Sequence, residues 1–217
     1  MWFYWLASKA VDVVSAAICR RVVEGRENVP ADGPLILVSN HLSLVDPPLL
    51  GAVFPRPIRF MAKEELFHAP IVQWVVAGYR AFPIRRGEAD RQALQTTLRL
   101  LKQGEVVGIF PEGTRSRRGA MTAAHQGVAL IALRSGAPLI PVGIAGTEQI
   151  FRCPRSSLRP AVVVRIGRPF HLEPTGNGTG REALAGHTDR IMREIAALVP
   201  PPYRGIYASV AGVAKPV

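Results

Sequence analysis

Six short apolar runs recur along the chain from residue 35 onward, and they alternate with segments patterned as helices. The runs span residues 35–39, 58–62, 81–84, 105–110, 139–144 and 161–166. Continuous apolar runs of this length are typical of buried strands. The helical segments are 90–103, 125–134 and 181–198, each followed closely by glycine or proline. This alternation predicts one α/β domain, with a mixed, largely parallel sheet flanked by helices.

The first 30 residues predict an amphipathic helix. One polar stripe runs along the helix, and apolar residues cover the rest of its surface. The stripe consists of Tyr4, Ser8, Asp12 and Ser15. Two interpretations are open: the helix lies in the headgroup layer of a membrane as an interfacial anchor, or it docks on its own domain. Arg20 and Arg21 are expected to close the helix at the end where its dipole favours cations.

The predicted organisation of the chain has three parts. An amphipathic helical segment covers residues 1–30, a single domain covers residues 31–200, and a loose tail covers residues 201–217. The longest run without a charged residue has fifteen residues, 119–133. A membrane-spanning helix needs roughly 20 apolar residues, so no segment is expected to span a bilayer.

Arginine dominates the charge of the chain. Of 27 basic residues only four are lysines, which leaves 23 arginines against 16 acidic residues and a formal net charge of +11. Arginine binds phosphate and carboxylate groups through paired hydrogen bonds, so we expect an anionic partner. The two cysteines, Cys19 and Cys153, cannot form a disulfide framework and lack metal-ligand spacing. We therefore expect no metal in the chain.

Polar side chains follow the apolar run at 35–39. His41 comes shortly after it, beside Asn40, and Asp46 follows five residues later. An imidazole abstracts protons near pH 7, and it does so better when a carboxylate holds one ring nitrogen. Pro47 disfavours helical backbone at Asp46, so we expect the chain to turn there and bring the carboxylate to the imidazole. The alternative is a loop histidine and an aspartate that caps the following helix.

A second polar cluster follows the apolar run at 105–110. Gly113 allows close backbone approach to a ligand, Thr114 offers a hydroxyl, and Arg115 offers a fork of donors, which together predict a phosphate cradle. Glu112 would repel phosphate, so we expect it to bind a hydroxyl or to orient an arginine. A third basic group, Arg85 and Arg86, also follows a predicted strand.

Three segments together resemble the motifs of the glycerolipid acyltransferase superfamily, and the nearest branch is the 1-acyl-sn-glycerol-3-phosphate acyltransferases. The segments are Asn40-His41-x-x-x-x-Asp46, Phe110-Pro111-Glu112-Gly113-Thr114-Arg115-Ser116 and Pro138-Leu139-Ile140-Pro141-Val142. Residues 82–86 stand where that family has its second motif, whose final arginine matches Arg86. The resemblance covers residues 34–168.

The resemblance implies an acyl transfer without a metal or redox cofactor. His41 would deprotonate the 2-hydroxyl of a 1-acyl-glycerol-3-phosphate, with Asp46 supporting it, and the oxygen would attack an acyl thioester of coenzyme A or acyl-carrier protein to give phosphatidic acid. Asn40, Arg85, Arg86, Glu112, Gly113, Thr114 and Arg115 would bind the substrates. No covalent acyl-enzyme is implied, so Ser43 is not expected to act as a nucleophile.

The expected partners are therefore a lysophospholipid acceptor, an acyl thioester donor and an anionic membrane surface. The expected location is the cytoplasmic face of the membrane, as a peripheral or monotopic protein. Segment 69–79 is a second candidate for lipid contact, and the alternative is a buried core helix. A nucleic-acid partner is not expected, because the sequence carries no P-loop, zinc-finger spacing or aromatic stacking motif.

Two residues depart from the family pattern. Arg85 stands where the family often has an acidic residue, and the family usually has a lysine before the glycine where this chain has His125-Gln126-Gly127. The second departure leaves open a different acceptor, such as a lyso-glycolipid or a lyso-aminolipid. Apart from this possible acceptor role, His125 and His68 are expected to be ordinary surface or packing residues.

Overall fold

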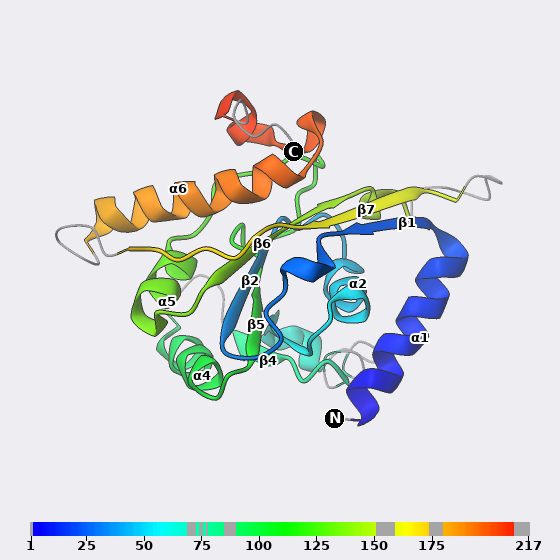
Figure 1. The fold of residues 1–217 in the computed structure, drawn as a ribbon, viewed down its shortest axis with the longest axis horizontal. Coiled ribbons are helices and arrows are strands. Elements are labelled where there is room, and N and C mark those ends of the chain that lie inside the picture. Colours follow the sequence, from blue (N-terminus) through cyan, green and yellow to red (C-terminus); the bar gives the residue numbers. More distant parts are fainter. Residues whose placement is uncertain are drawn as a thin grey trace.

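The computed structural model describes residues 2–68, 73, 76, 78–84, 90–150, 159–173 and 180–210. These residues form one α/β domain around a seven-stranded sheet (Figure 1). The strands are β1 (Arg20–Glu24), β2 (Leu35–Ser39), β3 (Ile58–Lys63), β4 (Phe82–Ile84), β5 (Val106–Ile109), β6 (Leu139–Ala145) and β7 (Ala161–Ile166). The α-helices are α1 (Trp2–Ile18), α2 (Asp46–Val53), α4 (Arg91–Lys102), α5 (Gly127–Ser135) and α6 (Arg181–Leu198).

The sheet is mixed and largely parallel, as predicted. Its strand order is β1-β7-β6-β2-β5-β3-β4, and β6 with β7 is the antiparallel pair among these neighbours. Each of the six predicted strands is present with ends within one residue of the prediction. The central strand β2 is buried along its whole length. A strand buried on both faces explains why the sequence there is a continuous apolar run.

Helices cover both faces of the sheet (Figure 1). One core cluster joins β2 and β5 to α4, α5 and α6, and the other joins the same strands to α2. Helix α1 packs against α2. Among the described residues, no helix combines the length and the apolar composition needed to cross a membrane.

Strand β1 was missed by the sequence analysis, and it corrects the expected end of the first helix. Arg20 and Arg21 do not close α1 but begin β1, which pairs in parallel with β7. The Arg20 N–H donates to the carbonyl of Pro160 at 2.9 Å. The backbone therefore leaves the helix at Cys19 to complete an edge of the sheet, and the helical segment is shorter than 30 residues.

Helix α1 is amphipathic in the opposite sense to a normal surface helix. Its polar stripe faces the domain, with Tyr4, Ser8 and Ser15 all buried. The Tyr4 hydroxyl donates to the Gly51 carbonyl at 3.3 Å and accepts from the Ile58 N–H at 3.0 Å, and burial raises the pKa of Tyr4 to about 12. The apolar face points outward, where the exposed side chains are Trp2, Phe3, Trp5, Leu6, Val13, Val14 and Ile18. We call these seven residues the outer face of α1.

The residues after α6 do not form a loose tail as far as they are described. Two 3-10 turns, η4 (Pro201–Tyr203) and η5 (Gly205–Val210), return to the domain. Tyr207 is buried in the core cluster beneath α6. Residues 211–217, and most of the predicted lipid-contact segment 69–79, lie outside the described residues.

Candidate active site

Three strand ends bring polar residues together at one edge of the sheet. β2 lies between β5 and β6 and is parallel to both, so the carboxyl ends of the three strands lie side by side. His41 follows β2, Glu112 follows β5 and Thr147 follows β6. These residues and Asp46 form what we call the strand-end cluster, and all four side chains are buried.

The side chains of His41 and Asp46 meet, as the sequence predicted. Nδ1 of His41 lies 2.8 Å from Oδ2 of Asp46. The turn lies before Asp46 rather than at it, because Asp46 is the first residue of α2. The same carboxylate oxygen accepts the backbone N–H groups of Leu42 and Ser43 at 2.7 and 2.8 Å. Both donors precede the helix, so Asp46 closes the loop back onto the imidazole instead of capping α2.

Hydrogen bonds around Asp46 define the tautomer of His41. The other oxygen, Oδ1, accepts from the Thr147 hydroxyl at 2.6 Å, so backbone and hydroxyl donors surround the carboxylate. A carboxylate can only accept, which assigns the hydrogen on His41 to Nδ1 and leaves the lone pair on Nε2. The imidazole stacks on Phe110 with ring centroids 4.1 Å apart and planes 22° apart. Asp46 and Phe110 therefore fix the orientation of the imidazole, and Nε2 is the ring nitrogen that Asp46 does not engage.

Glu112 connects the two predicted clusters. Its Oε1 accepts the backbone N–H of His41 at 3.3 Å. Its Oε2 accepts the N–H and the hydroxyl of Thr122 at 2.8 and 2.9 Å. Both oxygens are thus engaged within the protein and the residue is buried, while the expected contact with a substrate hydroxyl or an arginine stays a prediction.

Asn40 is likewise engaged within the protein. Its amide donates to the Ile144 carbonyl at 2.8 Å and accepts the Ile144 N–H at 2.8 Å. The side chain is fully buried between β2 and β6. Asn40 thus fixes the end of β2 to β6, directly before His41, and its binding of substrate stays a prediction.

The rest of the second cluster lies open to solvent. Thr114 and Arg115 are exposed, and so are Arg117 and Arg118. Gly113 has φ +67°, and a Cβ at this position would lie 2.8 Å from the ring of His125. The positive φ favours glycine here, and the ring of the exposed His125 lies close to it. Arg85 and Arg86 lie outside the described residues.

Three residues of this site were missed by sequence reasoning. Phe110 was read only as part of a motif, although it provides the surface on which the imidazole stacks. Thr147 follows a strand end just as His41 does, so the strand-end rule applied to β6 would have found it. Thr122 had no local signal, because its role depends on the fold of a loop that returns to Glu112.

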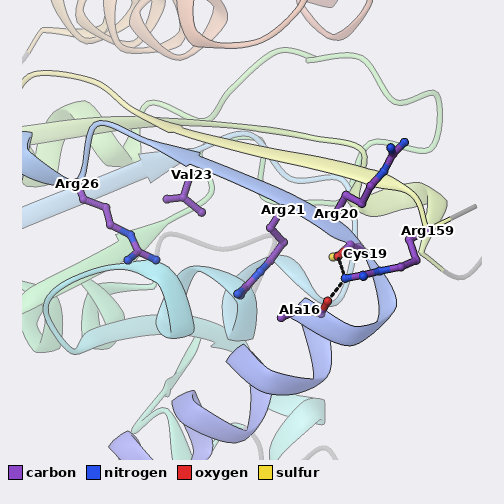
Figure 2. Close-up of a pocket in the computed structure, with 7 residues that line it drawn as sticks. All are labelled: Ala16, Cys19, Arg20, Arg21, Val23, Arg26 and Arg159. Atoms are coloured by element: carbon purple, nitrogen blue, oxygen red, sulfur yellow. Dashed lines mark hydrogen bonds between the residues drawn. The ribbon is translucent and has the colours of Figure 1, made fainter.

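A separate cavity of about 460 Å³ lies where α1 meets β1, and no residue of the strand-end cluster lines it. Figure 2 shows its lining side chains, which are Ala16, Cys19, Arg20, Arg21, Val23, Arg26 and Arg159. Arg159 donates to the carbonyls of Ala16 and Cys19, so it supplies the cation expected at the end of α1. Arg21 turns back to Asp12 at 2.8 Å.

Among the described residues, neither the thiol in this cavity nor any group of metal ligands indicates a second reactive centre. Burial raises the pKa of the Cys19 thiol, which disfavours the nucleophilic thiolate. Within the part of the chain that the structure describes, no group of three or more His, Cys, Asp or Glu side chains could hold a metal ion. The strand-end cluster is therefore the candidate active site.

The chain as a whole is similar in sequence to proteins named as acyltransferases. Residues 20–145 match the family model described as Acyltransferase. The chain is 31% identical over 205 residues to a 1-acyl-sn-glycerol-3-phosphate acyltransferase of Bacillus subtilis, covering 90% of this chain and 96% of that protein. A lyso-ornithine lipid O-acyltransferase of Pseudomonas aeruginosa is 34% identical over 113 residues, covering 52% of this chain and 43% of that protein.

A solved structure shares the fold. It is the crystal structure of PlsC, the 1-acyl-sn-glycerophosphate acyltransferase of Thermotoga maritima, with a TM-score of 0.71 and 29% sequence identity. The match covers 90% of this chain and 78% of that one. The similarity thus extends well beyond the strand ends that carry the candidate site.

Proposed function

The chain belongs to the acyltransferase family, and from this premise we propose that it acylates the 2-hydroxyl of a 1-acyl-glycerol-3-phosphate, using an acyl thioester as donor. The observation that carries the proposal is the His41–Asp46 contact of 2.8 Å at the meeting point of three strand ends. It leaves Nε2 of His41 as a base held in a fixed orientation. The names of the Bacillus subtilis and Thermotoga maritima proteins support this acceptor.

The proposed reaction needs no covalent enzyme intermediate. Nε2 of His41 takes the proton of the acceptor hydroxyl while its oxygen attacks the thioester carbonyl carbon. Asp46 stabilises the imidazolium through Nδ1. The tetrahedral intermediate then collapses, the C–S bond breaks, and the proton on His41 passes to the leaving thiolate. The products are a diacyl lipid and the free thiol of coenzyme A or acyl-carrier protein.

The exposed residues after β5 are proposed to bind the acceptor phosphate. Thr114 and Arg115 reach solvent beside the buried Glu112 that contacts the His41 backbone. A guanidinium there would hold a phosphate through paired hydrogen bonds. Arg85, Arg86 and the Gly113 backbone remain part of this proposal as sequence-based expectations.

The direct test measures thiol release from an acyl thioester, with and without lysophosphatidic acid. His41→Ala should lower kcat by about a thousandfold, the scale of general-base catalysis, because no other base is in place. The exposed His171 offers a matched control, and His171→Ala should keep wild-type turnover. Unfolding temperatures show whether each variant is folded. Wild-type turnover in folded His41→Ala would exclude His41 as the base.

The contact between His125 and Gly113 supports a second candidate acceptor, a lyso-aminolipid or lyso-glycolipid. The family usually has a lysine before the glycine where this chain has His125-Gln126-Gly127, and the ring of His125 lies directly against Gly113 in the exposed loop. One similar protein is named for such an acceptor, the lyso-ornithine lipid O-acyltransferase of Pseudomonas aeruginosa. The same assay with lyso-aminolipid and lyso-glycolipid acceptors decides between them, using both coenzyme A and carrier-protein thioesters.

The outer face of α1 supports membrane docking. Trp2 is 75% exposed and Val13 60% exposed, although both are large and apolar. Val22 on β1 is also exposed, close in sequence to Arg20, which is exposed as well. Contiguous apolar surface with aromatic residues suits the interfacial layer of a bilayer, and nearby arginines suit anionic headgroups. We propose a peripheral or monotopic enzyme on the cytoplasmic membrane face.

Vesicle flotation tests this docking. The double variant Trp2→Ser/Trp5→Ser should lower the partition coefficient onto phosphatidylglycerol-containing vesicles by about tenfold or more, because two apolar anchors are removed. Ile206 is equally exposed but lies on the C-terminal turns, so Ile206→Ser is the control. Wild-type flotation of the double variant, or a dimer formed through α1, would contradict membrane docking.

A further inference from the structure

The C-terminal turns after α6 lie against the loop that follows β5 (Figure 1). The Met121 N–H donates to the Tyr203 carbonyl at 2.9 Å, and the Ile206 N–H donates to the Met121 carbonyl at 3.4 Å. Gly205 has φ +53°, and a Cβ there would lie 1.9 Å from the Met121 carbonyl oxygen. The close approach of these two backbones therefore requires glycine at 205.

The side chain of Tyr203 makes a second contact in another part of the site. Its hydroxyl donates to Oε1 of Glu148 at 2.8 Å. Its ring packs against both core clusters, one on each face of the sheet. Burial, followed by the neighbouring Glu148 carboxylate, raises the pKa of Tyr203 to about 12. The phenol thus remains a protonated donor at neutral pH.

Each of these contacts ends one residue away from a group that holds the active site. Met121 directly precedes Thr122, which donates twice to Glu112, and Glu112 accepts the backbone N–H of His41. Glu148 directly follows Thr147, whose hydroxyl donates to Asp46. Tyr203 thus contacts both Met121, through its backbone carbonyl, and Glu148, through its hydroxyl.

We propose that Tyr203 is a positioning residue for the acyl transfer, which joins the loop holding Glu112 to the turn holding Thr147 and thereby orients His41 and Asp46. This inference rests on the proposed function for its kinetic consequence, but not for its structural one. Tyr203 touches no reacting atom and acts through Glu148 and Met121. The C-terminal turns are then part of the active-site support rather than an appendage.

The test compares variants that remove or keep single contacts. Tyr203→Phe and Glu148→Ala each break the hydroxyl–carboxylate bond, whereas Glu148→Gln keeps an oxygen that accepts it. Tyr4→Phe removes a buried phenol hydroxyl that bonds to Gly51 and Ile58, away from Glu148 and Glu112, and serves as the matched control. Gly205→Ala should push the turns away from Met121 and weaken the other contact.

The first readout is kinetic. Tyr203→Phe and Glu148→Ala should lower kcat by about tenfold, since small displacements of catalytic groups have large effects on rate, with the KM for the acceptor unchanged. Glu148→Gln and Tyr4→Phe should keep the wild-type kcat. The double variant Tyr203→Phe/Glu148→Ala should lose no more than either single variant, because both remove the same bond.

The second readout does not depend on the acceptor. The proton on Nδ1 of His41 should give a downfield NMR resonance that is absent in His41→Ala. Tyr203→Phe should shift or broaden this resonance, whereas Tyr4→Phe should not. If Tyr203 had a merely structural role, Tyr203→Phe and Tyr4→Phe would both lower the unfolding temperature and leave the His41 resonance in place.

The outcomes separate the two proposals. Unchanged kcat and an unchanged His41 resonance in Tyr203→Phe would overturn the positioning role even if His41→Ala is inactive. Equal changes in Tyr4→Phe would overturn it too. If the wild type transfers no acyl group to any acceptor, the proposed function fails, while the NMR comparison still decides whether Tyr203 orients His41.

Discussion

The polar residues after β2 and those after β5 differ in how completely the protein itself engages them. After β2, the His41–Asp46 pair is buried, and the carboxylate accepts from two backbone N–H groups and from Thr147 as well. After β5, Glu112 is buried and engaged in the same way, but Thr114 and Arg115 face solvent. The change from buried to exposed occurs within three residues of one loop.

Under the proposed function, this difference would separate a preorganised reaction centre from a surface that binds the acceptor phosphate. A base that must act in a fixed direction gains from partners that hold it before the substrate arrives. An arginine that binds phosphate must instead keep its donors available for the ligand. We call the buried His41–Asp46 pair the closed end of the site, and the exposed Thr114 and Arg115 the open end. Changes at the closed end should affect kcat, and changes at the open end should affect KM.

The largest effect is expected at the closed end. Asp46→Asn keeps the size of the side chain but offers an amide that cannot accept equally from Leu42, Ser43 and the imidazole, so it should disfavour the Nδ1–H tautomer of His41. We expect kcat to fall by about a hundredfold or more with little change in KM. Steady-state kinetics in folded protein measure this, with Asp189→Asn on the exposed face of α6 as control. A change confined to KM would contradict the assignment.

The bridge between the two ends should give an intermediate effect. Glu112→Gln replaces one carboxylate oxygen by an amide, which faces either the His41 N–H or the two Thr122 donors without accepting from them. The His41 N–H is buried, and leaving it unpaired costs about 1–3 kcal/mol, so the unfolding temperature and kcat should both fall. Chemical denaturation and kinetics test this against Glu194→Gln, which lies exposed on α6. Wild-type stability of Glu112→Gln would argue against the bridge.

The smallest effect is expected at the open end. Arg115→Ala should raise the KM for a phosphate-bearing acceptor by about tenfold, which corresponds to the loss of roughly one charge-assisted contact. The unfolding temperature should not change, because the side chain is exposed. Arg115→Lys should recover part of the affinity, and Arg181→Ala at the start of α6 controls for lost net charge. A reduced kcat with unchanged KM would reverse the division between the two ends.

The sequence predicted the positions of the reactive residues better than their contacts. The approach of His41 and Asp46 followed from a short loop closed before a proline, which is local information. Glu112 was expected at a ligand and Asn40 at the substrate, because an isolated polar residue at a strand end looks available. Their partners, Thr122 and Ile144, reach them only after the β5 loop and β6 have taken their places.

The first helix shows the same limit on a larger scale. Its polar stripe was visible in the sequence, yet the direction of that stripe was not. Tyr4 bonds to Gly51 and Ile58, so the stripe faces the domain, and the apolar outer face of α1 is left uncovered. Strand β1 was missed because RRVVE carries only two apolar residues and becomes a strand by pairing with β7.

By itself the sequence determined the fold class, the positions of six strands in a largely parallel sheet, and the strand ends that polar residues follow. These depend on apolar runs and helical spacing, which act within a few residues. The tertiary structure alone decided which face of α1 is buried, which edge β1 completes, and that Glu112 contacts His41 and Thr147 contacts Asp46. These depend on hydrogen bonds and packing between segments distant in the chain, whose geometry no local pattern specifies.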